Sequence, residues 1–473
     1  MSDVTIRCDQ AIFTSIRTPM GEGYRIVAAS RTLHADEKQA ITKASPSHEG
    51  LCDPEAAGRE SHDAPSAVAF YPLPSGRACI GLSCAAGSEH TGRGGRRVYT
   101  HCAVFDPAEL SGCAFNLFNV VRSMVAAGLT SPQLKPPNPL PELSLTITDN
   151  APRGRKLGFP ASLNGEWRRA LLQAMLEKRN LIINIKEGWL DTIELLLMGF
   201  PGPLRADLSF AAGLRFSLGR QVNVQLLHDG TGQAKARAAG QQVEYLDPCH
   251  GTCTSRDGSA WLALVERHWS AADFVALDRR TSRRFDDCGA AGRERVARLY
   301  NSIDEMPQLE VAPVIQTIGA HLTAHAPGVE AEINDELLDA CRQRLLSRFG
   351  SAKWAEVKPH WRSLLEVSGR SANAASLLRP AVERALRCAL RDDPLDAAFV
   401  ALDVAGDAVS DSTDSGLTGL FEEILSRLAA LAPALEDADT GRLRAICTRW
   451  ERVRPACPIL HGIAQYITAG TPG

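Results

Sequence analysis

Apolar residues gather into three short runs between residues 67 and 105, and each run has the composition of a strand. The runs are Ala67–Leu73, Arg77–Cys84 and Val98–Phe105, rich in β-branched, aromatic and small apolar residues. Turn residues at 74–76 and several glycines between 87 and 95 separate them. Such runs, bounded by turn residues, are typical of antiparallel strands. We therefore expect a mostly antiparallel sheet that forms the core of the first domain.

The flanking patterns complete this first domain. Residues Val4–Ser15 and Tyr24–Ser30 favour β structure on either side of a glycine-containing turn and predict a hairpin. Leu33–Ile41 suits a short helix. Asp106 is placed to cap a further helix over Leu110–Val125, whose apolar residues recur at helical spacing. We expect that helix to cover one face of the sheet.

A proline-rich segment at residues 131–142 interrupts the regular patterns and predicts a linker between domains. After it, strand patterns and helix patterns follow each other. The predicted strands are Leu143–Ile147, Leu181–Ile185 and Val222–Leu227, and the predicted helices are Trp167–Leu176 and Trp189–Met198. Residues 230–242 look like an exposed loop or hairpin. This pattern predicts a small mixed α/β domain.

From Trp261 onward the pattern is helical. Ile333–Phe349 carries apolar residues along one continuous helix face, and residues 417–431 and 443–453 repeat this arrangement. The fold class predicted for the whole chain is α+β. It comprises an antiparallel-sheet N-terminal domain (1–130), the linker (131–142), a mixed α/β middle domain (143–255) and an all-α C-terminal domain (260–473).

Composition narrows the classes of function. A net charge of -3 in 473 residues gives no global attraction to nucleic acid or anionic membranes. The chain has no Gly-Lys dipeptide, which excludes a P-loop, and it lacks the common zinc-protease and nucleophile-elbow motifs. The first ten residues are too polar for a signal peptide, and no apolar run is long enough to cross a bilayer. These features predict a cytoplasmic protein with reduced cysteines, no membrane span and no cofactor.

Cysteine and histidine cluster at three places, and each cluster raises the question of a metal or thiol site. They are His48 with Cys52, Cys79–Cys84 with His101 and Cys102, and Cys249–Cys253. The spacings match no common zinc arrangement, so we predict no metal site. A thiol- or metal-dependent hydrolase centred on Cys52, His48 and His101 remains an alternative. Buried thiols and hydrogen-bonded histidines are the simpler interpretation.

The loop at residues 87–97 holds four glycines and three arginines, Arg93, Arg96 and Arg97. Backbone amides and guanidinium groups in such a loop suit a phosphate or a carboxylate-rich partner. A solvated hairpin tip, an arginine finger acting in trans, and a nucleic-acid sensor are alternative interpretations. The basic run at residues 278–284 is instead interpreted as a connector between helices, because acidic residues follow it and no aromatic residues interleave.

The N-terminal motifs also resemble a known family. They are Asp9–Phe13, Gly23 with Tyr24, Ala28–Ser30, Gly92–Gly95 and Tyr99–His101. Together they resemble the N-terminal domain of the bacterial GTPase-associated adaptor proteins. Gly202–Arg205 and Leu208–Ala211 are similar to the middle domain of that family, and the helical remainder would be its C-terminal domain.

The resemblance implies a multidomain, non-enzymatic adaptor or regulator that works with a GTPase encoded nearby in a bacterial defence (conflict) system. An effector component of the same system is a further implied partner. No catalytic residue can be transferred through the resemblance. We therefore expect partner binding to involve Arg93, Arg96, Arg97, Tyr99 and His101, with no catalytic, metal or cofactor site.

Overall fold

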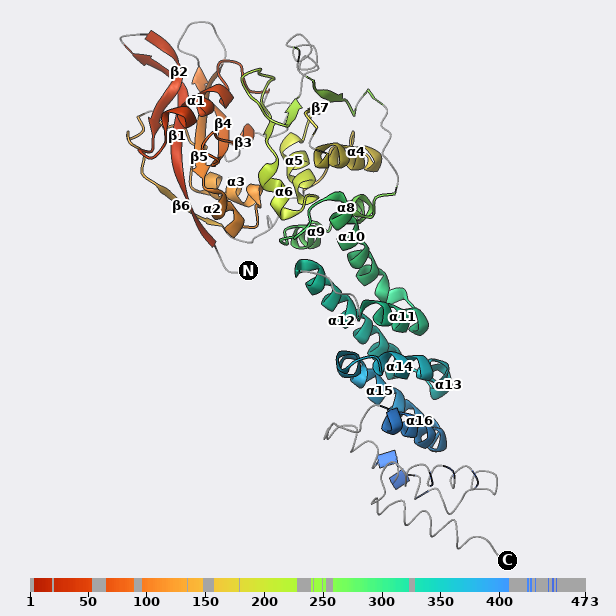
Figure 1. Ribbon diagram of the computed structural model, residues 1–473. Helices are drawn as coiled ribbons and strands as arrows, with labels where there is room; N and C mark the ends of the chain where they lie inside the picture. Colours follow the sequence, from red (N-terminus) through yellow and green to blue (C-terminus); the bar gives the residue numbers. More distant parts are fainter. Residues whose placement is uncertain are drawn as a thin grey trace, which may run out of the picture. The chain divides into compact units, whose positions relative to one another are not determined.

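The structure is a computed structural model of the chain (Figure 1). It describes residues 4–407 and a few residues between 423 and 448, with gaps at 19–20, 53–64, 89–95, 134, 148–156, 178, 228–239, 241, 249, 252–257 and 323–327. The chain divides into two compact units, Met1–Ala297 and Arg298–Gly473, and each is described by itself.

The first unit is built on one sheet of ten strands. The strand order is β10-β7-β9-β8-β3-β4-β5-β1-β2, and β6 pairs with the first half of β1. The strands are β1 (Val4–Thr18), β2 (Gly21–Ala29), β3 (Ala67–Pro72), β4 (Ala78–Ser88), β5 (Arg96–Phe105), β6 (Leu143–Ile147), β7 (Leu181–Asn184), β8 (Phe210–Ala212), β9 (Val224–Leu227) and β10 (Glu244–Leu246).

The first unit also contains helices that pack on the sheet or on one another. They are α1 (Ala35–Ala44), α2 (Pro107–Gly112), α3 (Leu117–Ala126), α4 (Gly165–Leu176), α5 (Trp189–Met198), α6 (Gly202–Asp207), α8 (Ala260–Ser270) and α9 (Phe274–Thr281). Helix α10 (Ala290–Glu305) runs across the division between the units.

Helices pack on both faces of the N-terminal strands, which explains why β3, β4 and β5 are apolar almost throughout. On one face, Ile41 of α1 packs in a core cluster with Ala69 and Tyr71 of β3. On the other, Phe118 of α3 stacks on Phe210, with ring centroids 6.2 Å apart. Strands buried on both faces lose the alternation of apolar and polar residues that a half-exposed strand shows.

The sheet does not stop where the predicted linker begins. Strand β6 pairs antiparallel with β1, and β8 pairs antiparallel with β3. From β8 outward the strands β8, β9, β7 and β10 run parallel to one another. An antiparallel half and a parallel half therefore share one sheet in the first unit, whose ribbon runs from red to green in Figure 1.

The α+β fold class is confirmed, but two local predictions are wrong. The single helix expected over Leu110–Val125 is two helices, because Ala114 and Phe115 both adopt φ of 53° and end the helical path. The connector expected at residues 278–284 begins inside α9, which continues to Thr281. Its first residue, Asp278, accepts a hydrogen bond from Asn116 and so belongs to the packed part of the unit.

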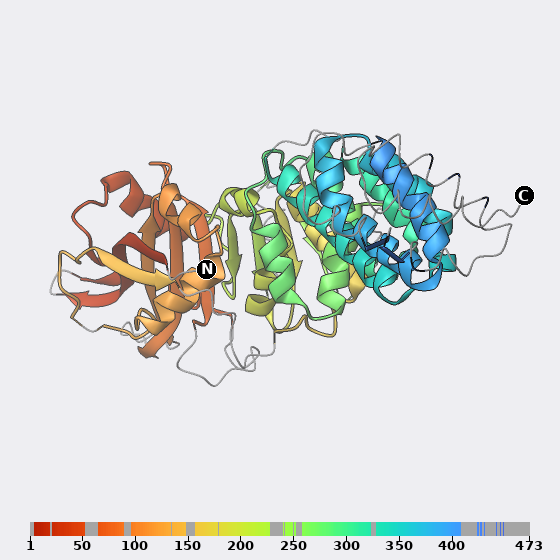
Figure 2. The same ribbon diagram turned by 90° about the horizontal axis from the view of Figure 1, so that it is seen from below.

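All described elements of the second unit are helical. They are η2 (Met306–Gln308), α11 (Val311–His321), α12 (Gly328–Ser351), α13 (Trp354–Val357), η3 (Lys358–His360), α14 (Trp361–Ser368), α15 (Ala372–Asp392) and α16 (Pro394–Asp407). In Figure 2, the teal and blue helices of this unit lie side by side.

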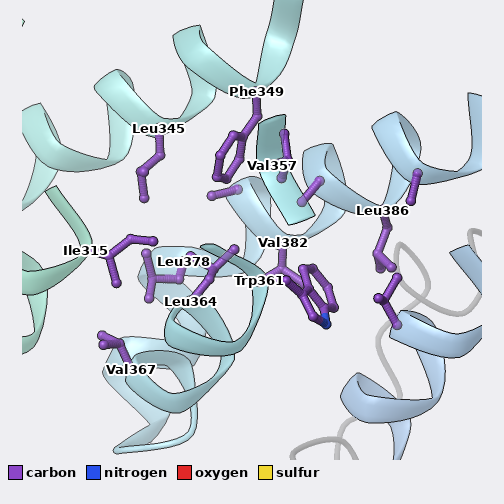
Figure 3. Packing of buried hydrophobic residues seen from close by; sticks show 14 of the residues in the cluster. Ile315, Leu345, Phe349, Val357, Trp361, Leu364, Val367, Leu378, Val382 and Leu386 are labelled. Atoms are coloured by element: carbon purple, nitrogen blue, oxygen red, sulfur yellow. The ribbon is translucent and has the colours of Figure 1, made fainter. Parts of the chain in front are cut away.

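One apolar core holds these helices together. The apolar face predicted for Ile333–Phe349 is confirmed, since Ile333, Leu345 and Phe349 of α12 are at most 1% exposed. Figure 3 shows Leu345 and Phe349 directed toward side chains of α14 and α15, among them Leu364 and Val382. The patterns at 417–431 and 443–453 lie outside the described residues, apart from single positions.

Candidate partner-binding site

The predicted binding residues lie on and beside the hairpin formed by β4 and β5. The strands pair antiparallel from Ala78 with Phe105 to Ser88 with Arg96. The tip of the hairpin, residues 89–95, lies outside the described residues, so the structure does not describe Arg93. The two strands place the described part of the loop at one end of the sheet, where β1 ends and β2 begins.

Four arginines gather at this end of the sheet. Arg17, Arg25 and Arg96 are exposed, and Arg97 is half-buried, with its Nε donating to the carbonyl oxygen of Ala86 at 3.0 Å. We call Arg17, Arg25, Arg96 and Arg97 the basic end of the sheet. Glu22 faces Arg17 across β1 and β2, and its Oε1 lies 2.9 Å from the Nε of Arg17. Because guanidinium groups are cationic, this end attracts anionic surfaces.

Tyr99 and His101, in contrast, are buried, and each is only 1% exposed. The Nε2 of His101 lies 2.9 Å from Gln10 Oε1, and the Gln10 amide donates to the carbonyl oxygen of Pro141. This arrangement assigns the His101 proton to Nε2 and leaves Nδ1 to accept from the Tyr99 hydroxyl at 3.4 Å. Burial lowers the pKa of His101 to about 4 and raises that of Tyr99 to about 12. Both side chains hold β5 and β1 together as neutral groups.

The opposite end of the same sheet contains a buried network of paired charges around Arg77. Arg77 donates to Glu37 through Nε at 2.9 Å and Nη2 at 2.7 Å, and to Asp9 through Nη1 at 2.6 Å. Glu37 has no exposed surface, and Ser75 and the backbone of His34 also donate to it. Burial alone would raise the pKa of Glu37, but the hydrogen bonds from Arg77, Ser75 and His34 lower it to about 2. The network joins β1, α1 and the turn before β4.

Cys52 and His101 of the alternative thiol site have different hydrogen-bond partners. Cys52 is 4% exposed, and its backbone amide donates to the carbonyl oxygen of Gly213. The ring nitrogens of His101 face Gln10 and Tyr99. No group of three or more His, Cys, Asp or Glu side chains suited to a metal ion occurs among the described residues. Cys249 and Cys253 lie outside them.

Arginine contacts over long sequence distances tie the first unit together, and two of them, made by Arg122 and Arg220, join its antiparallel half to its parallel half. Arg122 of α3 forms an ion pair with the buried Glu194 of α5 at 2.6 Å. Arg205 binds the carboxylate of Asp278 at 2.9 Å. Arg220, 3% exposed, donates to the carbonyl oxygens of Ala44, at the end of α1, and of Arg215. Burial lowers its pKa to about 10. No local sequence signal marks these contacts, because they join residues 72 to 176 positions apart.

The antiparallel sheet, its covering helices and its two charged ends thus define a mixed α+β domain with an exposed basic end. Residues 7–145 match the family model described as GTPase-associated protein 1, N-terminal domain type 2 (GAP1-N2). The N-terminal region is therefore a GTPase-associated protein domain, which confirms the resemblance noted over this part of the sequence. No curated protein and no solved structure gave a match.

The family match ends within β6, and it does not reach the middle or C-terminal regions. The resemblance of those regions to the other domains of the family stays a prediction. The roles of Arg93, Arg96, Arg97, Tyr99 and His101 in binding a partner also stay predictions. Within the described part of the chain, no helix combines the length and the apolar character needed to cross a membrane.

Proposed function

We propose that the chain is a non-enzymatic adaptor or regulator of a partner GTPase encoded nearby, within a bacterial conflict system, and that it acts in the cytoplasm. The observation that carries the proposal is the match of residues 7–145 to a GTPase-associated protein domain. The described geometry is compatible with a binding role, because the same domain exposes cationic side chains at one end of a rigid sheet.

The basic end is the proposed contact surface for the GTPase, and its chemistry selects an acidic partner surface. Arg25 and Arg96 are exposed on strands that are paired along most of their length, so little backbone entropy is lost when they bind. Arg97 extends the surface along the hairpin, and Arg93, which lies outside the described residues, is included in the proposal on the sequence alone. Tyr99 and His101 contribute from inside by holding β5 against β1. Opposite charges across such a surface speed association more than they slow dissociation.

The test is a binding measurement between the full chain and the GTPase encoded beside it, in the GDP state and with a non-hydrolysable GTP analogue. We expect saturable binding in at least one nucleotide state. The double variant Arg25→Glu and Arg96→Glu should weaken it by on the order of 10-fold or more, mainly through slower association. The effect should shrink as the salt concentration rises, because salt screens exposed charges.

The matched control is the double variant Arg7→Glu and Arg31→Glu, which makes the same charge change on exposed arginines at the other end of the sheet. This variant should bind nearly as well as the unmodified chain. An absence of binding in every nucleotide state would overturn the proposed function. Equal losses in the two double variants would overturn the assignment of the surface. GTP turnover by the partner, measured with the same proteins, separates an adaptor from a regulator.

A further inference from the structure

The parallel half of the sheet contains two buried amide groups whose oxygen atoms have no hydrogen-bond partner. Asn184 ends β7 and Gln225 lies in β9, and they are 6% and 5% exposed. The Oδ1 atom of Asn184 and the Oε1 atom of Gln225 are both fully enclosed and without a partner. Leaving such an acceptor buried and unpaired costs roughly 1–3 kcal/mol, so two of them require an explanation.

The two amides lie on the same face of the sheet. Strands β7 and β9 pair in parallel, with Ile182 opposite Gln225 and Asn184 opposite Leu227. Because side chains alternate along a strand, Ile182 and Asn184 share a face with Gln225 and Leu227. The shared apolar cluster of Ile182 and Leu227 agrees with this assignment. The unpaired oxygens therefore belong to neighbouring strands, two positions apart in register.

A carboxylate, that of Asp247, lies beside Asn184 on the side of β7 away from β9. Strand β10 pairs in parallel with β7, and Leu246 lies opposite Ile183, so the next residue, Asp247, is level with Asn184. The Nδ2 of Asn184 donates to Asp247 Oδ2 at 3.1 Å. This bond fixes the orientation of the amide, since turning it over would place its oxygen against the carboxylate. On the outer side, the exposed His250 holds Nδ1 3.3 Å from Asp247 Oδ2.

The position of this group in the fold is the usual one for a ligand. Asn184 and Asp247 lie at the carboxyl ends of parallel strands, where ligands of open α/β sheets bind. Two amide oxygens and one carboxylate make a donor set of oxygen atoms. Such a set suits hard cations, which take carboxylate and amide carbonyl oxygens and keep several waters.

We propose that Asn184, Gln225 and Asp247 form a binding site for a divalent cation that prefers oxygen ligands, Mg²⁺ or Ca²⁺. The site goes beyond the partner-binding role proposed above and lies in the part of the chain that the family match does not cover. It explains why two amides are buried with free acceptors on one face, beside a carboxylate.

The test is calorimetric titration of the full chain, stripped of metal with a chelator, with MgCl₂ and with CaCl₂ at constant ionic strength. We expect saturable binding of at least one of the two ions and a rise in melting temperature on its addition. Gln225→Met keeps the length of the side chain and removes the acceptor. We expect this variant to bind the ion at least 10-fold more weakly, with an unchanged or higher melting temperature in the metal-free state.

Asp247→Asn removes the charge with little change of shape, and it should weaken binding at least as much. This second variant keeps the test decisive even where Gln225→Met fails to fold. The control is Asp106→Asn, an exposed carboxylate elsewhere in the same unit, which should bind the ion normally. The proposal is overturned if neither ion binds, which would mean that the amides hold ordered water only. It is also overturned if both variants bind the ion as tightly as the unmodified chain.

Discussion

Arg77, at one end of the N-terminal sheet, and Arg25 and Arg96, at the other, show two opposite uses of arginine. At one end, Arg77 lies between Glu37 and Asp9, and three of its hydrogen bonds go to their carboxylates. At the other end, Arg25 and Arg96 face solvent. A guanidinium group neutralised inside the fold contributes to stability, whereas one left in solvent is available to another molecule. The surroundings of an arginine, and not its presence, therefore indicate which role it has.

The largest expected effect on the free energy of unfolding comes from removing Arg77 from its network with Glu37 and Asp9. Replacing Arg77 with Ala leaves Glu37 ionised and buried without its main partner. Removing one member of a buried pair costs about 3–5 kcal/mol. We expect a loss of this size in the free energy of unfolding, measured by denaturant titration and followed by circular dichroism. A loss below about 1 kcal/mol would mean that the network is not the structural anchor of this end.

A smaller effect, spread over pH, should come from the buried ionisable groups. His101 has a folded pKa of about 4, below the usual value of 6.5, so its contribution to stability is present above pH 6.5 and is lost as pH falls toward 4. Glu37, with a folded pKa of about 2, loses its contribution below pH 4.5. We expect the free energy of unfolding to fall by up to about 1.4 kcal/mol per pH unit for each group within its window.

The two windows can be separated by variants that do not titrate. His101→Gln should flatten the pH dependence between pH 6.5 and 4 and leave the lower window in place. Glu37→Gln should do the reverse, although it also lowers stability at neutral pH because Arg77 loses a charged partner. Unchanged slopes in both variants would show that other groups cause the acid sensitivity.

The smallest expected effect on stability belongs to the basic end. Arg25→Ala and Arg96→Ala remove exposed side chains, and such changes usually stay within about 0.5 kcal/mol. Denaturant titration, as for the Arg77 variant, measures the change in the free energy of unfolding. A loss above about 1 kcal/mol would remove the contrast between the two ends, because the exposed arginines would then also serve the fold.

Much of the fold could be predicted from local patterns. The hairpin of β1 and β2, the strands β3 to β5 and the apolar face of α12 all follow from the order of apolar and turn residues. The break between α2 and α3 could not be predicted, because Ala114 favours helix and takes a left-handed conformation only in the packed structure. Strand propensity also could not show that β8 would pair with β3.

The candidate site was predictable only in part. The glycines and arginines of the 87–97 loop mark a cationic hairpin, and the exposed Arg96 fits that reading. The burial of Tyr99 and His101 was not predictable, since it depends on Gln10 and on the loop at Pro141. The oxygen cluster at Asn184 was missed for the same reason. Asn184 and Gln225 lie on two strands and Asp247 directly follows a third, so local sequence patterns do not bring them together.

The pairing of β8 with β3 also means that the N-terminal domain is not structurally independent of the chain that follows it. A chain cut after residue 145 would lack β8, so the β3 edge that pairs with it would have unpaired backbone donors and acceptors. The side chain of Phe70 on this edge, now buried, would also lose its neighbour Phe210. Open, apolar strand edges recruit other strands. The N-terminal domain could therefore be moved into another protein only together with a strand that replaces β8 beside β3. For this reason, the two halves of the sheet should be inherited together.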